Sequence, residues 1–410
     1  MPFPLPLETL LGKPLMYLIF GIIGFAFGSV LEMSGFAIST KLAAQFYFKE
    51  MTVLKVMFTA IVVAMVLIFT SVGLGLLDFN QVWVNPTYLW SGILGGFIMG
   101  IGFIIGGFCP GTSLVSAVTG KLDGLFFVLG GLTGIFLFGE TVGFYEEFWN
   151  SGNYGRLTIM DWLKLPNGVV VTLVVFMALF MFWGSEQLER IFGKRNLKAE
   201  PRLRLAGAGL LALGAIAVIF IGQPDTAEKW ALFAPVKEPA LQERQVQIHP
   251  GELLAAMAND RLNLVMLDVR SEADYNLFHI RGARHLPLEQ VKAAVPKLLL
   301  EPAQNTVYVV MSNDEVAATE AWKILVAESV PNVYILEGGI NNWLKVFAVE
   351  EPEIAPTPTP PGPERLAYTF PAALGARYDA ADPSPHEWNL EYTPKIKLQV
   401  KRDKSGGGCG

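Results

Sequence analysis

Six apolar segments in the first half of the chain are each long enough to cross a membrane as a helix. A helix needs about 20 apolar residues to span a hydrocarbon core of roughly 30 Å. Hydrophobic residues make up 52% of the 410 residues and concentrate in these segments, at 14–38, 51–77, 88–108, 122–144, 167–184 and 203–222. They predict a polytopic α-helical membrane domain over residues 1–222. The N-terminus has no basic region and no small-residue cleavage site, so we expect the first segment to be retained.

The rest of the chain is water-soluble in character and divides into three parts. Residues 223–245 are a linker, and residues 246–350 alternate strand and helix signals, which predicts an α/β domain. Residues 351–410 are a tail that contains PTPTPPGP and ends in SGGGCG. A flexible chain of about 60 residues has an end-to-end distance of about 40 Å. This composition predicts a tether that carries Cys409.

Charge and cysteine content exclude several classes of protein. The net charge is −6 and no basic stripe occurs, which argues against nucleic-acid binding. Cys109 and Cys409 are the two cysteines, so a disulfide framework is not indicated. The chain lacks the ATP-binding loop G-x-x-x-x-G-K-[ST]. If this membrane protein moves a substrate, the absence of the loop leaves facilitated or ion-coupled transport. We expect no cofactor and no metal site.

The run GGFCPGTS at 106–113 breaks an apolar segment. Pro110 has no N–H and disfavours helical dihedral angles at Cys109, while Gly111 permits conformations that other residues avoid. Broken backbone at membrane depth occurs only where protein buries it or where it lines a wet cavity. The break is therefore a candidate substrate-binding site, which includes Gly107, Cys109, Pro110, Gly111, Thr112 and Ser113.

An internal repeat predicts that an earlier stretch of the chain, around Gly35 and Phe36, also belongs to this site. A shift of 72 residues places six positions on identical residues. These are Gly28 on Gly100, Gly35-Phe36 on Gly107-Phe108, Thr40 on Thr112, Leu42 on Leu114 and Lys49 on Lys121. Each copy holds two spans, so we expect parallel copies with the substrate at their interface, which adds Gly35 and Phe36 to the site. The alternative is that glycine-rich apolar segments resemble one another by composition.

Loop charges predict the topology. The link between the last two spans holds a basic cluster, which marks it as cytoplasmic, and Lys41, Lys49 and Lys121 then lie on the same side. The loop at 78–88 has no Lys or Arg, whereas Arg156 and Lys164 go against the pattern. Both termini are then outside, and the soluble domain is extracytoplasmic on an inner membrane.

The stretch GGFCPGTSLVSAVTGKLDG resembles the YeeE/YedE sulfur-transport family over residues 15–145. The resemblance implies passage of thiosulfate or a related sulfur compound. Ala37 stands where that family has another cysteine. A neutral thiol at Cys109 is a weak donor suited to a soft sulfur, and the hydroxyls of Thr112, Ser113 and Ser116 could meet the anionic oxygens. The alternatives are that Cys109 is a small buried hydrophobe and that Glu32 and Glu140, the acidic candidates, lie near the interfaces.

Residues 246–350 contain DVR at 268–270, HIRGA at 279–283, HLP at 285–287 and EGGI at 337–340 with Trp343. In order and spacing these landmarks are similar to those of the rhodanese superfamily. The resemblance places a catalytic cysteine after the strand VYVVM, but Ser312 stands there. A serine hydroxyl cannot hold a stable persulfide. We therefore expect an inactive domain in which Asp268, Arg270 and His279 are structural, and in which Asp314 and Glu315 disfavour an anion in the loop.

The leading interpretation is a membrane permease for thiosulfate or a related sulfur species, with a degenerate rhodanese-like domain for substrate capture or docking. A first alternative is a membrane-anchored sulfurtransferase or relay that uses Cys409 as the sulfur carrier. A second is a scaffold for periplasmic sulfur enzymes. Cys409 could also be a lipid or metal attachment point or an inert tail. The expected partners are the lipid bilayer, a small sulfur species and a periplasmic or cytoplasmic sulfur-carrier protein.

Overall fold

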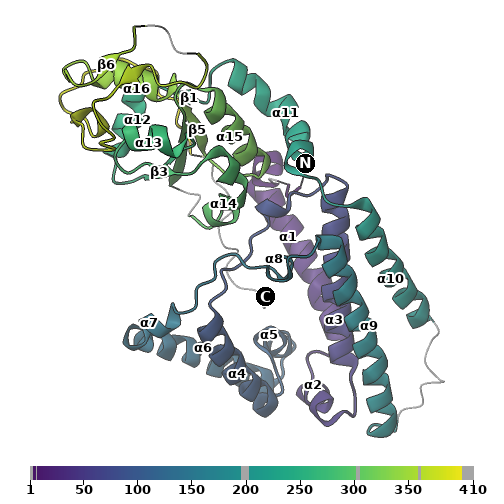
Figure 1. Cartoon of the computed structure of the whole chain (residues 1–410). Helices are drawn as coiled ribbons and strands as arrows, with labels where there is room; N and C mark the ends of the chain where they lie inside the picture. Colours follow the sequence, from purple (N-terminus) through teal and green to yellow (C-terminus); the bar gives the residue numbers. More distant parts are fainter. Residues whose placement is uncertain (1–2, 6, 195–202, 302–304, 359–361, 399–410) are drawn as a thin grey trace. The chain divides into compact units, whose positions relative to one another are not determined.

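The computed structural model describes residues 3–5, 7–194, 203–301, 305–358 and 362–398 (Figure 1). The chain forms two compact units. The membrane unit runs to Phe79 and continues from Val84 to Gln223. The soluble unit contains Asn80–Trp83 and the described residues from Pro224 to 398.

The membrane unit contains the six predicted spanning helices. Their bounds are α1 (Leu7–Met33), α3 (Thr52–Gly73), α4 (Leu89–Gly106), α6 (Leu122–Thr141), α9 (Asn167–Ile191) and α10 (Leu203–Ile221). The prediction of six spans is confirmed by length and composition. The first helix ends five residues before the expected position 38, because Gly35 takes a left-handed conformation with φ 80°.

Shorter helices connect the spans. They are α2 (Ser39–Ala44), η1 (Gln45–Tyr47), η2 (Phe79–Gln81), α5 (Pro110–Val118), η3 (Val142–Phe144), α7 (Glu146–Trp149) and α8 (Ile159–Leu163). Helices α1, α2 and α3 repeat the order of α4, α5 and α6: a long helix, a left-handed glycine, a short helix and a second long helix. The two glycines are Gly35 and Gly107, which the 72-residue shift aligns. This order supports the repeat over a similarity of composition.

Helices α3, α9 and α10 pack through small and β-branched side chains. Val171, Val175 and Ala215 are fully buried in their common core. A fully buried carboxylate, Glu189, accepts hydrogen bonds from Lys55 Nζ and the Met51 N–H, both at 2.6 Å. These bonds satisfy the buried charge and join the end of α9 to the start of α3.

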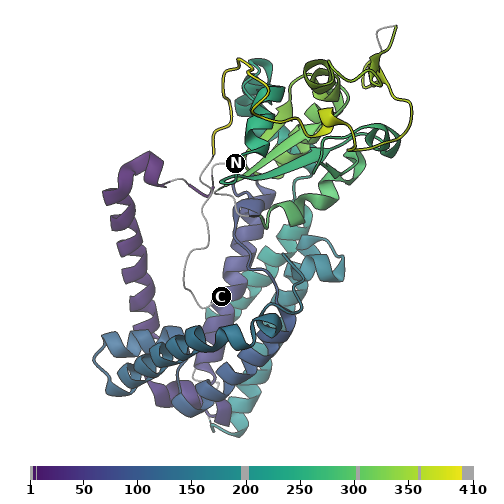
Figure 2. The same cartoon turned by 90° about the vertical axis from the view of Figure 1, so that its left-hand side faces the viewer.

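The soluble unit is built on a five-stranded parallel sheet with helices on both faces (Figures 1 and 2). The strand order is β1-β5-β4-β2-β3. The strands are β1 (Gln247–Ile248), β2 (Asn263–Asp268), β3 (Arg284–His285), β4 (Thr306–Met311) and β5 (Val333–Leu336). Strand β4 is central and every residue in it is buried, as expected for a parallel strand covered on both faces.

The sheet divides the core of the soluble unit in two, and helices cover each face. On one face lie α14 (Val291–Leu298) and α15 (Val316–Ala327), and on the other lie α12 (Pro250–Met257) and α16 (Gly339–Phe347). The short helices α13 (Glu272–Leu277) and η5 (Leu288–Gln290) follow β2 and β3. The α/β prediction is confirmed. Because the strands are parallel, the loops that follow β2 and β4 meet at one edge of the sheet.

The segment before the sheet is a helix, α11 (Thr226–Gln242). Asp225 and Glu228 form a capping box at its start, which the motif D-x-x-E predicts locally. Trp230 of α11 packs edge-on against Trp322 of α15, with ring centroids 5.9 Å apart. The carboxylate of Glu328 accepts hydrogen bonds from Lys229 Nζ at 2.5 Å, Thr226 Oγ1 at 2.7 Å and Asn80 Nδ2 at 2.8 Å.

Removing the Glu328 charge is expected to change how stability depends on pH. Burial acts to raise the pKa of this carboxyl, but the bonds from Lys229, Thr226 and Asn80 outweigh it and hold the pKa below the ordinary 4.5. Ionised Glu328 therefore stabilises the fold fully above pH 4.5, and this contribution is lost as the pH falls through the folded pKa. Substitution E328Q should cost about 1–3 kcal/mol at pH 7.

Thermal unfolding from pH 7 to pH 3 tests this expectation. The gap between wild type and E328Q should shrink below pH 4.5. The control is E320Q on α15, the helix that ends just before Glu328. The Glu320 side chain is 55% exposed and pairs with Lys323. We expect E320Q to change stability by less than about 1 kcal/mol at every pH. A gap for E328Q that stayed constant with pH would contradict the role of its charge.

The tail differs from the predicted tether. Residues 351–358 and 362–398 lie on the soluble unit, seen as the yellow trace in Figure 2. Ile354, Ala380 and Ala381 are buried in its core. The tail also contains β6 (Ala355–Pro356), β7 (Tyr368–Thr369) and η6 (Asp379–Ala381).

Hydrogen bonds fix the tail along its length. The Trp343 indole donates to the Ala380 carbonyl at 2.7 Å, and Glu252 accepts from the Lys395 and Ile396 N–H groups at 2.7 Å. The estimate of a 40 Å reach assumed about 60 flexible residues. That assumption is wrong, because much of the tail packs. Cys409 lies outside the described residues.

Candidate functional site

The predicted break in the third span is present. Helix α4 ends at Gly106, Gly107 is left-handed with φ 71°, and Cys109 is extended with φ −91° and ψ 167°. Helix α5 begins at Pro110, where the missing N–H costs no hydrogen bond. The chain therefore passes from one helix to the next with Cys109 as the N-cap residue.

The thiol of Cys109 takes part in a reciprocal cap. Its sulfur accepts from the Thr112 N–H at 3.4 Å, and the Thr112 hydroxyl accepts from the Cys109 N–H at 2.9 Å. The hydroxyl and the sulfur are 3.3 Å apart. Cys109 is half-buried and Pro110 is exposed. The thiol thus lies at the start of a helix in an interrupted span and contacts polar atoms of Thr112.

The other predicted polar groups are side chains of α5 itself. Thr112, Ser113 and Ser116 are all buried. The Ser113 hydroxyl donates to the Pro110 carbonyl at 2.8 Å. Ser116 packs closely against Gly124, and its buried hydroxyl has no hydrogen-bond partner among the residues described. The hydroxyls of Thr112 and Ser113 would have to rotate to meet a ligand.

The structure brings the two breaks together. A side chain at Gly107 would meet the carbonyl oxygen of Ser39 at 3.1 Å. Lys121 Nζ, just after α5, donates to the Ala37 carbonyl at 3.0 Å. The two repeat-matched phenylalanines, Phe36 and Phe108, are each 1% exposed and share one core cluster. The paired positions Gly35-Phe36 and Gly107-Phe108 therefore lie in one region, as the repeat predicts.

Two further hydrogen bonds lie next to the two breaks. Ser39 Oγ donates to Asp123 Oδ2 at 2.7 Å, and Lys41 Nζ donates to the Ser34 carbonyl at 2.9 Å. Glu32 and Glu140 lie at exposed positions on α1 and α6. Neither carboxylate takes part in the contacts of the break described above. Among the residues that the structure describes, no group of three His, Cys, Asp or Glu side chains could hold a metal ion.

A second site lies in the loop between β4 and α15. Ser312 follows β4 and is fully buried. Arg270, 3% exposed, donates twice to Asp268, from Nε at 2.9 Å and from a terminal nitrogen at 2.6 Å. It also donates to the Phe278 carbonyl at 2.6 Å and to Asn313 Oδ1 at 3.2 Å. The DVR motif thus contacts the loop through the bond from Arg270 to Asn313.

His279 and His285 also have structural contacts. Their rings stack on Tyr275, with centroids 3.9 Å and 4.7 Å away. One ring nitrogen of His279 is 2.8 Å from the Tyr275 carbonyl oxygen, and one of His285 is 3.0 Å from that of Arg270. These contacts support the structural roles expected for the rhodanese-like landmarks.

The two acidic residues of the loop are engaged by other groups. Glu315 pairs with Arg244 at 2.7 Å and accepts from the Gly338 N–H at 2.6 Å. Asp314 accepts from the Val316 N–H at 2.8 Å and the Glu364 N–H at 2.9 Å. The carboxylate of Glu364 nevertheless lies in this loop, so the two acidic residues disfavour an anion there without excluding one.

Glu364 is the site residue that sequence reasoning missed. Its carboxylate accepts from Ser312 Oγ at 2.9 Å, the Ala317 N–H at 2.7 Å and the Asn313 N–H at 3.3 Å. A single glutamate in a Pro-rich tail carries no local signal for such a contact.

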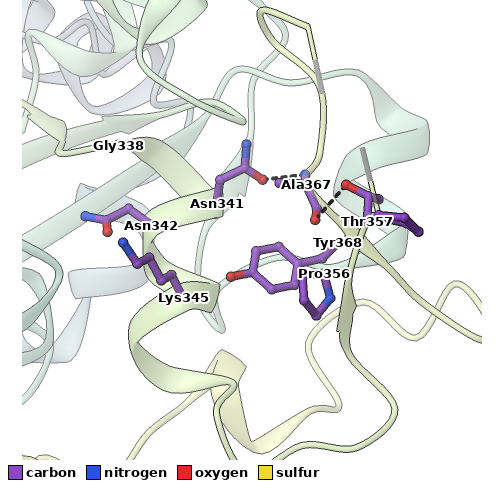
Figure 3. A pocket seen from close by; sticks show the side chains of 9 residues that line it. Gly338, Asn341, Asn342, Lys345, Pro356, Thr357, Ala367 and Tyr368 are labelled. Atoms are coloured by element: carbon purple, nitrogen blue, oxygen red, sulfur yellow. Dashed lines mark hydrogen bonds between the residues drawn. The ribbon is translucent and has the colours of Figure 1, made fainter. Parts of the chain in front are cut away.

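A groove of about 480 Å³ lies beside this segment (Figure 3). It is bordered by α16 and by the two strands of the tail hairpin. Asn341 Oδ1 accepts from the Ala367 N–H at 2.7 Å, and the Thr357 hydroxyl donates to the Ala367 carbonyl at 3.1 Å. Lys345 and Tyr368 also line the groove in Figure 3.

Comparisons with known proteins agree with both resemblances. The family model described as sulphur transport matches residues 33–238, half of the chain. The match begins later than the expected range of 15–145 and continues beyond its end. The model described as a rhodanese-like domain matches residues 249–346. No curated protein and no solved structure matches the chain. The chain therefore belongs to the sulphur transport family and carries a rhodanese-like domain after its membrane helices.

Proposed function

We propose that this sulfur-related membrane protein is a permease for thiosulfate or a similar small sulfur species, and that Cys109 contacts the substrate. The observation that carries the proposal is the thiol at the N-cap of α5, in an interrupted span. Family membership supports a sulfur species as the substrate. Interrupted helices place backbone polar groups where a substrate can use them.

The chemistry of the break suits a sulfur-bearing anion. The Cys109 sulfur accepts from the Thr112 N–H, so its own S–H remains a donor for the soft terminal sulfur of thiosulfate. The start of a helix favours negative charge, which suits the oxygens of the anion. The approach of Gly35-Phe36 to Gly107-Phe108 supports a passage formed where the two repeats meet.

The soluble unit has a binding or docking role in this proposal and no sulfurtransferase activity of its own. Ser312 occupies the position where rhodaneses carry cysteine, and a hydroxyl does not form a stable persulfide. We place the unit outside the inner membrane. The loop at 80–83, which has no Lys or Arg, belongs to the same compact unit as the chain from Pro224. This supports one side for the loop after α3 and the domain after α10.

Uptake of sulfur-labelled thiosulfate into proteoliposomes tests the transport role. We expect C109A to lower the initial rate by about tenfold or more, because a hydrogen bond to a charged partner contributes about 1.5–3 kcal/mol. The matched control is C409A, which removes the other cysteine and should leave uptake unchanged.

Other outcomes would exclude parts of the proposal. Uptake by C109A at the wild-type rate would remove Cys109 from the mechanism. Loss of uptake in C409A would favour the relay in which Cys409 carries sulfur. Uptake by wild type no faster than by empty liposomes would reject the permease.

A further inference from the structure

The loop between β4 and α15 is filled by a side chain from a distant part of the sequence. Glu364 lies about 50 residues after Ser312, in the tail. One carboxylate oxygen accepts from Ser312 Oγ and the Ala317 N–H, and the other accepts from the Asn313 N–H. The side chain of Asn313 also donates to the Glu364 carbonyl at 3.1 Å. Side chain and backbone of this residue are thus both held by the loop.

The donors that hold Glu364 form an anion-binding arrangement. One is the Ala317 N–H in the first turn of α15, a helix of 12 residues. The second is the Asn313 N–H in the loop before that helix, and the third is the Ser312 hydroxyl. Backbone N–H groups at a helix start favour negative charge. The Ser312 hydroxyl accepts in turn from the Ala318 N–H at 3.2 Å, which directs its proton toward the carboxylate. Arg270 supports the loop through Asn313.

The backbone at Glu364 adopts an uncommon conformation. Its φ is +56°, in the left-handed region that residues with a side chain seldom occupy. The tail is fixed next to it, because Asn341 accepts from the Ala367 N–H and donates to the Arg365 carbonyl at 2.9 Å. A side chain that reaches the loop from an unfavourable backbone conformation indicates that the contact offsets the strain.

We propose that Glu364 is a tethered carboxylate ligand that occupies this loop and keeps it closed to free anions. When Glu364 leaves, the donors of Ser312, Asn313 and Ala317 are open to a small tetrahedral oxyanion. The ligand class follows from the donors, which offer three hydrogen bonds to one negatively charged group. This inference goes beyond transport, because it concerns the soluble unit alone.

A neighbouring charge keeps the affinity for a free anion modest. Burial raises the pKa of Asp314, but the hydrogen bonds from Glu364, Val316 and Glu315 lower it to about 2, so Asp314 stays ionised. Burial and the nearby Asp314 raise the pKa of Glu364. Repulsion from Asp314 therefore opposes any anion in the loop. A tethered carboxylate overcomes this through its effective concentration, which reaches the millimolar range for short tethers.

Hydrogen exchange on the full-length protein in detergent tests the proposal. The variant is E364Q, which keeps the shape of the side chain and removes its charge. The matched control is E353Q, an exposed glutamate of the same tail. We expect the rate of amide exchange across residues 313–318 to rise at least about tenfold in E364Q and to match wild type in E353Q. A tenfold increase in the equilibrium constant for loop opening corresponds to the loss of about one ordinary hydrogen bond.

Sulfate at constant ionic strength is the probe for the open loop. We expect sulfate to restore protection in E364Q, to leave wild type unchanged and to act less in the double variant S312A/E364Q. Exchange in E364Q equal to wild type would overturn the role of Glu364. Exchange that rises in E364Q but does not respond to sulfate would overturn the anion site. The variant E364G, which relieves the left-handed strain, should behave as E364Q does if the carboxylate closes the loop.

Discussion

Substitution G339A is expected to destabilise the soluble unit by about 2–5 kcal/mol, the sum of roughly 1–2 for a left-handed residue and 1–3 for overpacking. Gly339 has φ 62° and begins α16. A methyl group there would overlap the carbonyl oxygens of Ser312 and Asp314. These backbone atoms cannot easily move, because the Ile340 N–H donates to the Ser312 carbonyl at 2.8 Å. The substitution should therefore distort the loop that holds Glu364.

The control for this prediction is another left-handed glycine of the same unit. Gly282 has φ 84°, and a methyl group there would meet only the end of Met266, at 3.6 Å. G282A should cost about 1–2 kcal/mol, the conformational part alone. Denaturant unfolding of the full-length protein, followed by tryptophan fluorescence, measures both variants. Equal losses for G339A and G282A would contradict the overlap with the loop carbonyls.

Substitution D268A is expected to cost about 3–5 kcal/mol, because it leaves a buried guanidinium without its partner. Asp268 is fully buried, and the Arg270 side chain is 1% exposed. Asp268 accepts two side-chain bonds from Arg270 and one from the Arg270 N–H at 3.1 Å. The loss should also loosen Asn313, to which Arg270 donates.

An exposed pair in the same unit provides the comparison. Arg281 and Asp382 are 2.9 Å apart, with side chains 71% and 50% exposed. D382A should cost less than about 1 kcal/mol. The double variant D268A/R270M should regain part of the stability lost in D268A, because no buried charge remains. A D268A protein as stable as D382A, or a double variant less stable than D268A, would show that the buried charge is not the cause.

Local chemistry determined the elements of this protein. Each run of apolar residues of membrane-crossing length predicts one of the six spans, independently of the rest of the sequence. Helix α4 ends at Gly106 because Gly107 can adopt a left-handed conformation and because Pro110 has no N–H to continue the helix. The rhodanese-like landmarks predict the parallel sheet and place Ser312 after its central strand. Each of these signals lies within a few residues of what it predicts.

Only the tertiary structure decided which distant groups meet. Nothing in the sequence near Lys121 indicates that its ammonium reaches the Ala37 carbonyl, although the repeat predicts that the two breaks are close. The Pro-rich composition of the tail predicts an extended chain, but Trp343 of α16 and Glu252 of α12 hold that chain on the soluble unit. The carboxylate of Glu364 reaches Ser312 because the folded tail carries it there. Such contacts depend on packing between segments far apart in the chain, and that packing leaves no pattern in either segment alone.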